Sequence, residues 1–227
     1  MRKLSILFIA VFFAVTAGAQ IGVKLGANFA GLSSSTETDG SKMAIGFHGG
    51  IVYEKGILPL GLLKLRTEVQ YSQQGFAVYD DNGVVVTDTR FSINYLKLPI
   101  MAKVKLGPIY VMAGPYFGYA LNGSYTGSMK SALGTVDMDI DIYDNDNSPL
   151  LPYKKFDMGL DAGLGMQFGI PAIPFKIFIE GRAAIGLSNI YDTENDKFKA
   201  VVTLGGIKDT DYIKNLVFQV SVGVLLF

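Results

Sequence analysis

The C-terminal segment, residues 215–227, alternates between apolar and smaller or polar side chains. One face of the predicted strand carries only apolar side chains, at Leu216, Phe218, Val220, Val222, Val224 and Leu226. The opposite face includes Gln219, Ser221 and Gly223. This period of two predicts a β-strand. A strand edge this apolar promotes aggregation when it is left open, so we expect it to close against another strand of the chain.

Seven further segments show the same alternation and are predicted strands: 21–31, 44–55, 62–74, 91–104, 109–121, 153–168 and 175–188. The connections between the eight strands are alternately long and short. The long ones are 32–43, 75–90, 122–152 and 189–211, and the segment 75–90 could also extend the hairpin between its flanking strands. Short turns at one rim and long loops at the other are typical of outer-membrane barrels. We therefore predict an all-β fold, an eight-stranded antiparallel up-and-down transmembrane barrel with both termini at the short-turn rim.

The polar faces of these strands carry charges of both signs among many glycines. Eight strands enclose a space that side chains can fill. We expect a charge network inside the barrel, formed by Lys64, Arg66, Glu68, Lys97, Asp157, Asp161, Glu180 and Arg182. The apolar faces then contact lipid, because a water-soluble barrel would turn them inward. The same charges could instead line a narrow pore or a small-ligand pocket, and the sequence leaves this alternative open.

Aromatic residues lie near the predicted strand ends on the lipid side. Such residues form girdles at the two membrane interfaces of outer-membrane barrels. The predicted girdle residues are Phe29, Tyr53, Tyr71, Phe117, Tyr119, Phe156, Phe168 and Phe175.

The N-terminus has the three parts of a secretory signal peptide. A basic start at Arg2 and Lys3 precedes the apolar run 4–15, and small residues follow at 17–19. We predict cleavage after Ala19, which leaves 20–227 as the barrel domain. The mature chain has no apolar run of about 18 residues, the length needed by a membrane-spanning helix.

Composition excludes several classes of function. The 20 basic and 20 acidic side chains balance, which argues against nucleic-acid binding, since phosphates need a basic surface. The absence of Cys excludes disulfides and thiolate metal sites. The sequence contains no phosphate-binding glycine loop, nucleophile elbow or zinc-protease helix motif, and we expect no cofactor.

Two candidate sites have simpler interpretations. His48 is the only histidine, and its phase places it inside the barrel, where we favour a polar interior role over catalysis. Alternating acids occur in the longest connection, at Asp137, Asp139, Asp141, Asp144 and Asp146. The spacing does not fit an EF-hand, because Ile142 and Ser148 stand where Gly and Glu are required. We favour a hairpin that extends above the membrane over a calcium site.

Two local conflicts remain in the strand pattern. Pro99 and Pro115 lie inside predicted strands, although proline cannot donate to a ladder and a closed barrel has no free edge. We expect a β-bulge at these sites, with Pro99 in a bulge or near a loop. Phe227 is out of phase with the apolar row before it; a bulge near Gly223 would restore the phase, and without one Phe227 points inward.

Several segments resemble the PorT-like outer-membrane β-barrel family of Bacteroidota. They are the signal-peptide end AGAQ, then IGVKLGANFAGL, TEVQYSQQG and INYLKLPIMAKVKLG, and a last strand that ends in an aromatic residue. The resemblance covers nearly all of 20–227. It implies a small barrel in the Gram-negative outer membrane, and the family's namesake takes part in a protein-secretion system.

The resulting functional hypothesis is a non-enzymatic envelope structural or interaction protein that uses its long extracellular loops. Its expected partners are outer-membrane lipid, the outer-membrane assembly machinery, and extracellular or periplasmic proteins. The termini are expected in the periplasm. The alternatives are the narrow pore or ligand binder, a secretion-system component, an envelope enzyme that depends on His48, and a soluble lipocalin-like binder.

Overall fold

A computed structural model describes residues 19–34, 41–58, 62–81, 85–131, 134–143, 153–169, 174–196, 198–199 and 213–226. The predicted signal peptide, apart from Ala19, and Phe227 lie outside these residues. No helix in the described ranges is long and apolar enough to cross a membrane. The strands are β1 (Ala19–Ser34), β2 (Ser41–Gly56), β3 (Leu63–Asp81), β4 (Val85–Leu106), β5 (Ile109–Ser131), β6 (Gly134–Asp141), β7 (Phe156–Gly169), β8 (Phe175–Gly186) and β9 (Ile213–Leu226).

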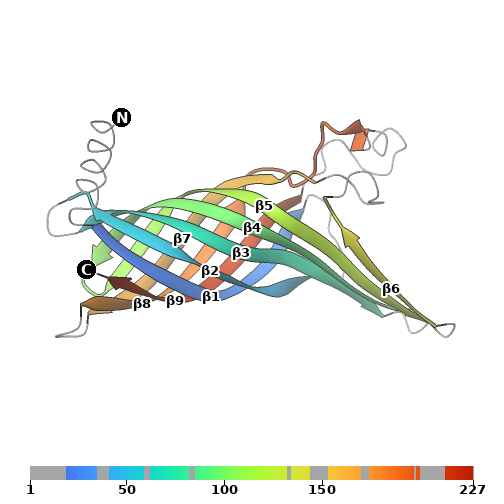
Figure 1. The fold of residues 1–227 in the computed structure, drawn as a ribbon, viewed down its shortest axis with the longest axis horizontal. Helices are drawn as coiled ribbons and strands as arrows, with labels where there is room; N and C mark the ends of the chain where they lie inside the picture. The colour runs from blue at the N-terminus through green and yellow to red at the C-terminus, as the bar shows by residue number, and fades with distance from the viewer. Residues whose placement is uncertain are drawn as a thin grey trace, which may run out of the picture.

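Eight of these strands form a closed antiparallel barrel (Figure 1). The ring runs β1-β2-β3-β4-β5-β7-β8-β9 and closes where β9 pairs with β1. The apolar C-terminal strand thus has no open edge, with Ile21 opposite Leu226 at the closure. The predicted fold class is confirmed.

The connections differ at the two ends of the barrel. Short connections join β2 to β3, β4 to β5 and β7 to β8 at one end, where the first residues of β1 and the last of β9 also lie. Between β4 and β5, Gly107 takes a φ of 69°, a conformation that glycine adopts easily. The long connections lie at the other end, which we call the loop end.

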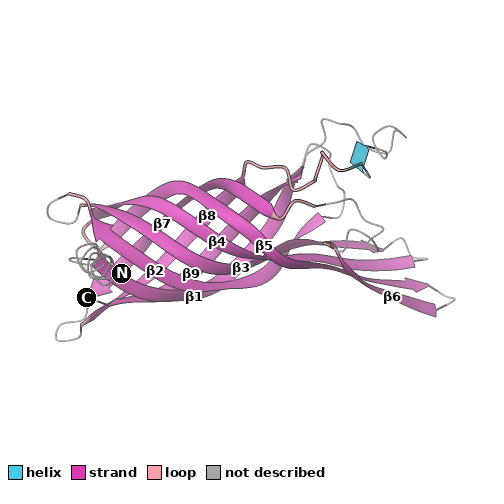
Figure 2. Ribbon diagram, turned by 45° about the horizontal axis from the view of Figure 1, so that its top comes forward, coloured by secondary structure: helices cyan, strands magenta, loops and turns pink. Residues whose placement is uncertain are grey.

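Part of the sheet continues beyond the barrel at the loop end (Figure 2). The predicted loop 75–90 is mostly strand, because β3 runs to Asp81 and β4 begins at Val85. The connection 122–152 likewise starts inside β5, and β6 folds back on β5 with Ser128 opposite Asp137. The hairpin predicted for the acidic segment is confirmed in β6. We call the outer parts of β3, β4 and β5, together with β6, the extension.

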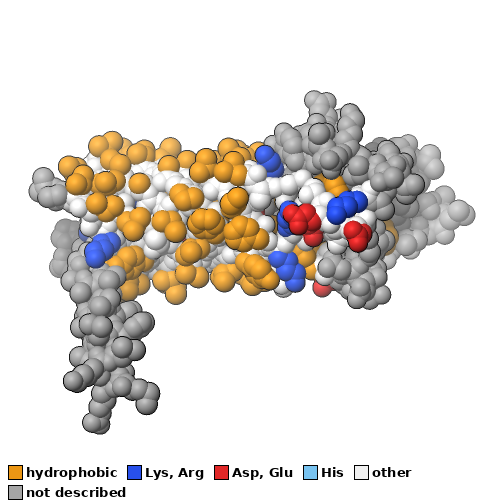
Figure 3. Space-filling model, turned by 90° about the horizontal axis from the view of Figure 1, so that it is seen from above, with side chains coloured by type: hydrophobic (Ala, Val, Ile, Leu, Met, Phe, Trp, Pro, Cys, Tyr) orange, Lys and Arg blue, Asp and Glu red, His pale blue; other side chains and the backbone are white. Residues whose placement is uncertain are grey.

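The two faces of the barrel wall differ in chemistry as the alternation predicts. On β3, Leu65 and Val69 face outward, whereas Arg66, Glu68 and Gln70 are buried inside. Hydrophobic side chains cover the outer wall, and charged side chains gather toward its ends (Figure 3). An apolar outside around a charged inside is the polarity of a barrel that lies in lipid.

The β-bulges predicted at the prolines are absent, and β9 has no bulge near Gly223. The β4–β5 register is the same at Pro99 opposite Tyr116 as at Ala102 opposite Ala113, and β9 keeps one register against β1 throughout. The described register shifts lie elsewhere, between Met43 and His48 and between Asn94 and Tyr95. Each proline lacks one ladder donor, and the pairing resumes in the same register beyond it, so no extra residue is needed.

Candidate functional site

The barrel interior holds charged side chains almost completely removed from solvent. Among the described residues, five cations and five anions are at most 4% exposed. They are Lys24, Arg66, Lys97, Lys103 and Arg182, and Glu54, Glu68, Asp157, Asp161 and Glu180. Equal numbers of each sign make a neutral interior possible without protonating a carboxylate. Buried charges are costly unless they are paired, so their partners decide whether the barrel is stable.

Glu68 is the centre of this network. Its Oε2 lies 2.7 Å from Lys24 Nζ, and its Oε1 accepts a hydrogen bond of 2.6 Å from Arg66 Nε. Arg182 donates to both oxygens, with 3.1 Å from Nη1 to Oε2. One carboxylate from β3 therefore holds cations from β1, β3 and β8.

Glu180 and Glu54 extend the network along the barrel. Glu180 forms an ion pair with Arg182, with 2.8 Å between Oε1 and Nη2, and its Oε2 accepts a hydrogen bond from the Tyr110 hydroxyl at 2.8 Å. Glu54 Oε1 accepts from Arg66 Nη1 at 3.0 Å and from Lys103 Nζ at 2.6 Å. Arg66 also donates from Nη2 to Glu180 Oε1 at 3.2 Å, so it connects these two glutamates as well as Glu68.

Lys64 lies at the edge of the network near the short-turn end. It is half-buried and donates to Glu54 Oε2 at 3.2 Å and to Gln20 Oε1 at 2.7 Å. Its position at the end of the strand leaves part of the side chain exposed.

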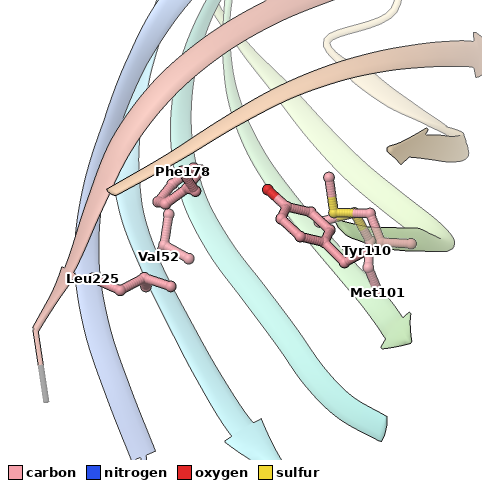
Figure 4. Packing of buried hydrophobic residues seen from close by; sticks show 6 residues of the cluster. Val52, Met101, Tyr110, Phe178 and Leu225 are labelled. Atoms are coloured by element: carbon pink, nitrogen blue, oxygen red, sulfur yellow. The ribbon is translucent and has the colours of Figure 1, made fainter. Parts of the chain in front are cut away.

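Apolar side chains pack beside the charges near the short-turn ends of their strands. Val52, Met101, Tyr110, Phe178 and Leu225 belong to this cluster (Figure 4). The Phe178 ring lies 4.7 Å from the Arg66 guanidinium carbon, and Lys103 Nζ lies 3.8 Å from the centre of the Tyr110 ring. These contacts give the cations a second kind of partner.

A separate cluster surrounds Asp157 toward the loop end. Its carboxylate accepts hydrogen bonds from the Tyr116 hydroxyl at 3.1 Å, Asn215 Nδ2 at 2.8 Å and Ser188 Oγ at 2.6 Å. Lys97 Nζ lies 3.5 Å from the centre of the Tyr116 ring. Asp161, four residues further along β7, lies 3.5 Å from Arg182 Nη1 and connects this region to the main network.

His48 lies inside the barrel between two polar partners. Its Nδ1 is 2.7 Å from Asn28 Oδ1, and its Nε2 is 2.7 Å from Ser221 Oγ. A hydroxyl, an imidazole and an orienting group in a row is an arrangement that activates a nucleophile. Ser221 is only 2% exposed, however, so a substrate does not reach its hydroxyl in this structure. The Asn28 amide also donates to Ser72 Oγ at 3.1 Å, which makes the group part of the interior packing.

A row of aromatic side chains lies at the loop end of the barrel. The ring centres of Phe76 and Phe91 are 5.0 Å apart, and those of Phe91 and Tyr153 are 5.1 Å apart. The row continues through Tyr191 to Phe198, with 5.7 Å at each step. Burial raises the pKa of the Tyr153 hydroxyl above its ordinary value. We call these five residues the aromatic cap.

The predicted girdle residues all point outward from the barrel wall. Phe29, Tyr71, Phe117, Tyr119 and Phe156 lie toward the loop end of their barrel segments. Tyr53, Phe168 and Phe175 lie toward the short-turn end. Phe117 and Phe156 stack on neighbouring strands, with ring centres 6.4 Å apart. Their position at the membrane interfaces stays a prediction.

The acidic segment does not gather into a metal site. Asp137, Asp139 and Asp141 are exposed along β6, and Asp144 and Asp146 lie outside the described residues. In the described part of the chain, no group of three or more His, Asp or Glu side chains is placed to hold a metal ion.

The comparisons with known proteins identify the family. A family model described as an outer membrane protein beta-barrel domain matches residues 13–192. The chain belongs to this family. It is therefore an outer-membrane barrel protein, in agreement with the apolar outer wall. The comparison with curated proteins gives no match.

Solved outer-membrane barrels are similar to this member of the family over most of their length. Ail, the attachment invasion locus protein of Yersinia pestis, has 11% identity and a TM-score of 0.37, over 92% of this chain and 99% of Ail. Neisserial surface protein A has 17% identity and a TM-score of 0.37, over 92% and 98%. The Escherichia coli outer membrane protease OmpT has 9% identity and a TM-score of 0.37, over 92% and 96%. Likenesses this low say nothing about the activity of this chain.

The set predicted from sequence omits several members of the interior network of this family barrel. Lys24, Glu54 and Tyr110 were not among the predicted charges and partners. Each has the same inward phase as its polar neighbours, so the alternation alone could have included them. The prediction selected strands with several charges, whereas β1 contributes a single lysine among glycines.

Proposed function

We propose that this outer-membrane barrel does not conduct and is not an enzyme, and that it acts as a structural or interaction protein of the envelope through its loop end. The observation that carries this proposal is the filled interior. Glu68 ties together side chains from β1, β3 and β8, so the network crosses the space that a pore would need.

The side chains at both ends of the interior also support a barrel that does not conduct. The apolar cluster around Phe178 and Met101 occupies the short-turn side, and the aromatic cap packs at the loop end. An ion that entered would have to displace these side chains and separate paired charges in a poorly hydrated space. Breaking one buried ion pair costs about 3–5 kcal/mol, which is a high barrier for steady conduction.

A narrow pore or small-ligand binder is the second candidate. It is favoured by buried polar atoms that have no hydrogen-bond partner among the described residues, including Gln70 Nε2, Asp161 Oδ1 and Arg182 Nε. Unpaired buried groups of this kind often bind internal water. Water bound to these atoms would form the first part of a water-filled path through the barrel.

The signal peptide, the periplasmic termini and the PorT-like assignment are proposed from the sequence. The three-part N-terminus supports a cleaved signal peptide over 1–19, and this export route would leave both termini in the periplasm. The matched segments support a PorT-like barrel, and a role in a secretion system rests on that resemblance alone. The outer-membrane assembly machinery and lipid are the partners that any such barrel needs. The burial of the Ser221 side chain, which would be the nucleophile beside His48, supports the non-enzymatic role.

Planar-bilayer recording tests the proposal. The refolded chain 20–227 is expected to give no steady conductance at any applied voltage. Steady openings that Arg66→Ala or Lys97→Ala alters, and that the exposed control Lys199→Ala leaves unchanged, would contradict it and favour the pore.

A further inference from the structure

The extension ends in a strand with one unpaired edge. Within the described residues, β6 pairs with β5 alone and is the last strand in the sheet order. The backbone N–H and C=O groups on its other edge therefore have no ladder partner in this part of the chain. Such an edge is a template for another extended segment.

One face of β6 is acidic. Asp137, Asp139 and Asp141 are exposed and share this face, since alternate residues of a strand point the same way. Met138, which is 38% exposed, and Ile140 lie on the other face. The acidic face continues onto β5 at Thr126 and Ser128, which lie opposite Asp139 and Asp137.

The guanidinium of Arg90, two strands away on β4, is directed away from these aspartates. Arg90 on β4 donates from Nη2 to the Ile45 carbonyl at 2.7 Å, toward β2 and away from β6. Arg90, Thr126, Ser128 and Asp137 line a hollow of about 440 Å³ over the paired strands β4, β5 and β6. Within the described residues, the edge thus combines backbone groups that have no ladder partner with an adjacent face that carries three exposed aspartates.

We propose that the free edge of β6 binds an extended polypeptide segment of a partner protein in which basic and apolar side chains alternate. The segment adds to the sheet as a further strand. Its basic side chains lie beside Asp137, Asp139 and Asp141, and its apolar side chains lie beside Met138. Directly opposite side chains in a sheet are about 5 Å apart, close enough for each acid to face one base. The proposal deepens the interaction role proposed above and rests on it.

The negative charge at this edge disfavours three other ligands: a second copy of the chain, nucleic acid and anionic lipid. A second copy of the chain would bring the same aspartates against these, and like charges that face each other destabilise a strand pair. Nucleic acid and anionic lipid are repelled by the same acidic row. An extended basic segment is the one of these ligands that both the backbone edge and the charge favour.

Peptide binding to the full barrel in zwitterionic detergent tests the proposal. The probe is a fluorescent peptide of alternating Lys and Val, and the matched peptide has the same composition with Lys and Val in two blocks. The alternating peptide is expected to bind about tenfold more tightly, because only its basic side chains all reach the acidic face. A version with N-methylated backbone is expected to lose binding, because it lacks the ladder donors.

Two sets of substitutions distinguish binding at the β6 edge from nonspecific attraction of the peptide to acidic residues elsewhere. The triple variant Asp137→Asn, Asp139→Asn and Asp141→Asn is expected to weaken binding about tenfold. The control Asp192→Asn, Glu194→Gln and Asp196→Asn changes the same number of acids in the connection after β8 and is expected to change binding less than about twofold. Far-UV circular dichroism checks that both variants keep the barrel.

The proposal is overturned when the two peptides bind alike or when the control variant weakens binding as much as the β6 variant. When the peptide fails to bind and bilayers show no conductance, this inference falls and the proposed function stands. Steady conductance overturns the proposed function whatever the peptide does.

Discussion

Replacing Glu68 by Gln tests whether the interior charges hold this barrel together. The substitution keeps the size of the side chain and removes one buried negative charge. Lys24, Arg66 and Arg182 all contact this carboxylate. The buried set then has five cations and four anions, one fewer than the five counted above. Removing one partner of a buried ion pair costs about 3–5 kcal/mol, so Glu68→Gln should reduce the free energy of unfolding by that amount.

Urea unfolding of the refolded chain in lipid micelles measures this loss. Far-UV circular dichroism is the readout, because the chain has no tryptophan. With a urea dependence of about 1–3 kcal/mol per molar, the midpoint should fall by about 1 M or more.

A second variant identifies charge as the cause. Lys24→Met combined with Glu68→Gln restores equal numbers of buried charges. The double variant should therefore be less destabilised than the sum of the two single variants, by about 1–3 kcal/mol. The exposed control Glu194→Gln should change stability by less than about 0.5 kcal/mol. The reasoning is refuted when Glu68→Gln shifts the midpoint no more than Glu194→Gln does.

Three further predictions use the same unfolding assay. Gly159→Ala should lower stability by about 1–3 kcal/mol, because a Cβ at Gly159 would lie 2.1 Å from the Ile185 carbonyl oxygen and 2.6 Å from the Tyr116 ring. Gly181→Ala, whose Cβ would meet nothing within 4 Å, is the matched control, and equal losses would contradict the packing described here. His48→Ala should cost about 1–3 kcal/mol by removing the hydrogen bonds of the imidazole to Asn28 and Ser221, and ester hydrolysis that disappears in this variant would instead reveal an enzyme. Phe91→Ala should cost about 3 kcal/mol by opening the aromatic cap, and a loss no larger than that of exposed Phe156→Ala would count against the cap.

The alternation within the membrane made the barrel predictable from the sequence. Leu65 and Val69 against Arg66 and Glu68 give one face to lipid and one to the interior, and a shift of one residue would exchange them. Closure followed from the apolar row of β9, which needed a partner at its edge.

The ends of the strands were less predictable because the environment changes there. In the extension, Ser124, Thr126 and Ser128 of β5 are separated by Tyr125 and Gly127, so the row of apolar side chains that marks the outer face of the barrel stops there. The sequence therefore reads as a loop where β3, β4 and β5 continue. The β-bulge predicted at Pro99 is absent because the residue pairs on both sides of it keep β4 and β5 in register across one missing backbone donor.

The pairing inside the barrel could not be read from the sequence at all. Phase shows that Glu68, Arg182 and Lys24 face inward. Which of them meet depends on the tilt and stagger of eight strands. Residues 156 and 114 positions apart in sequence become direct partners in this way, as in Lys24–Glu180 and Arg182–Glu68.

The most direct test of the account is a map of which face of β3 meets lipid. The chain has no native cysteine, so single cysteines can be placed along residues 65–72 and spin-labelled in bilayers. The account predicts that labels at 65, 67, 69 and 71 are reached by oxygen dissolved in lipid, whereas labels at 66, 68, 70 and 72 are shielded. Labels at 66 and 68 that meet lipid, or an accessibility with no period of two, would contradict it.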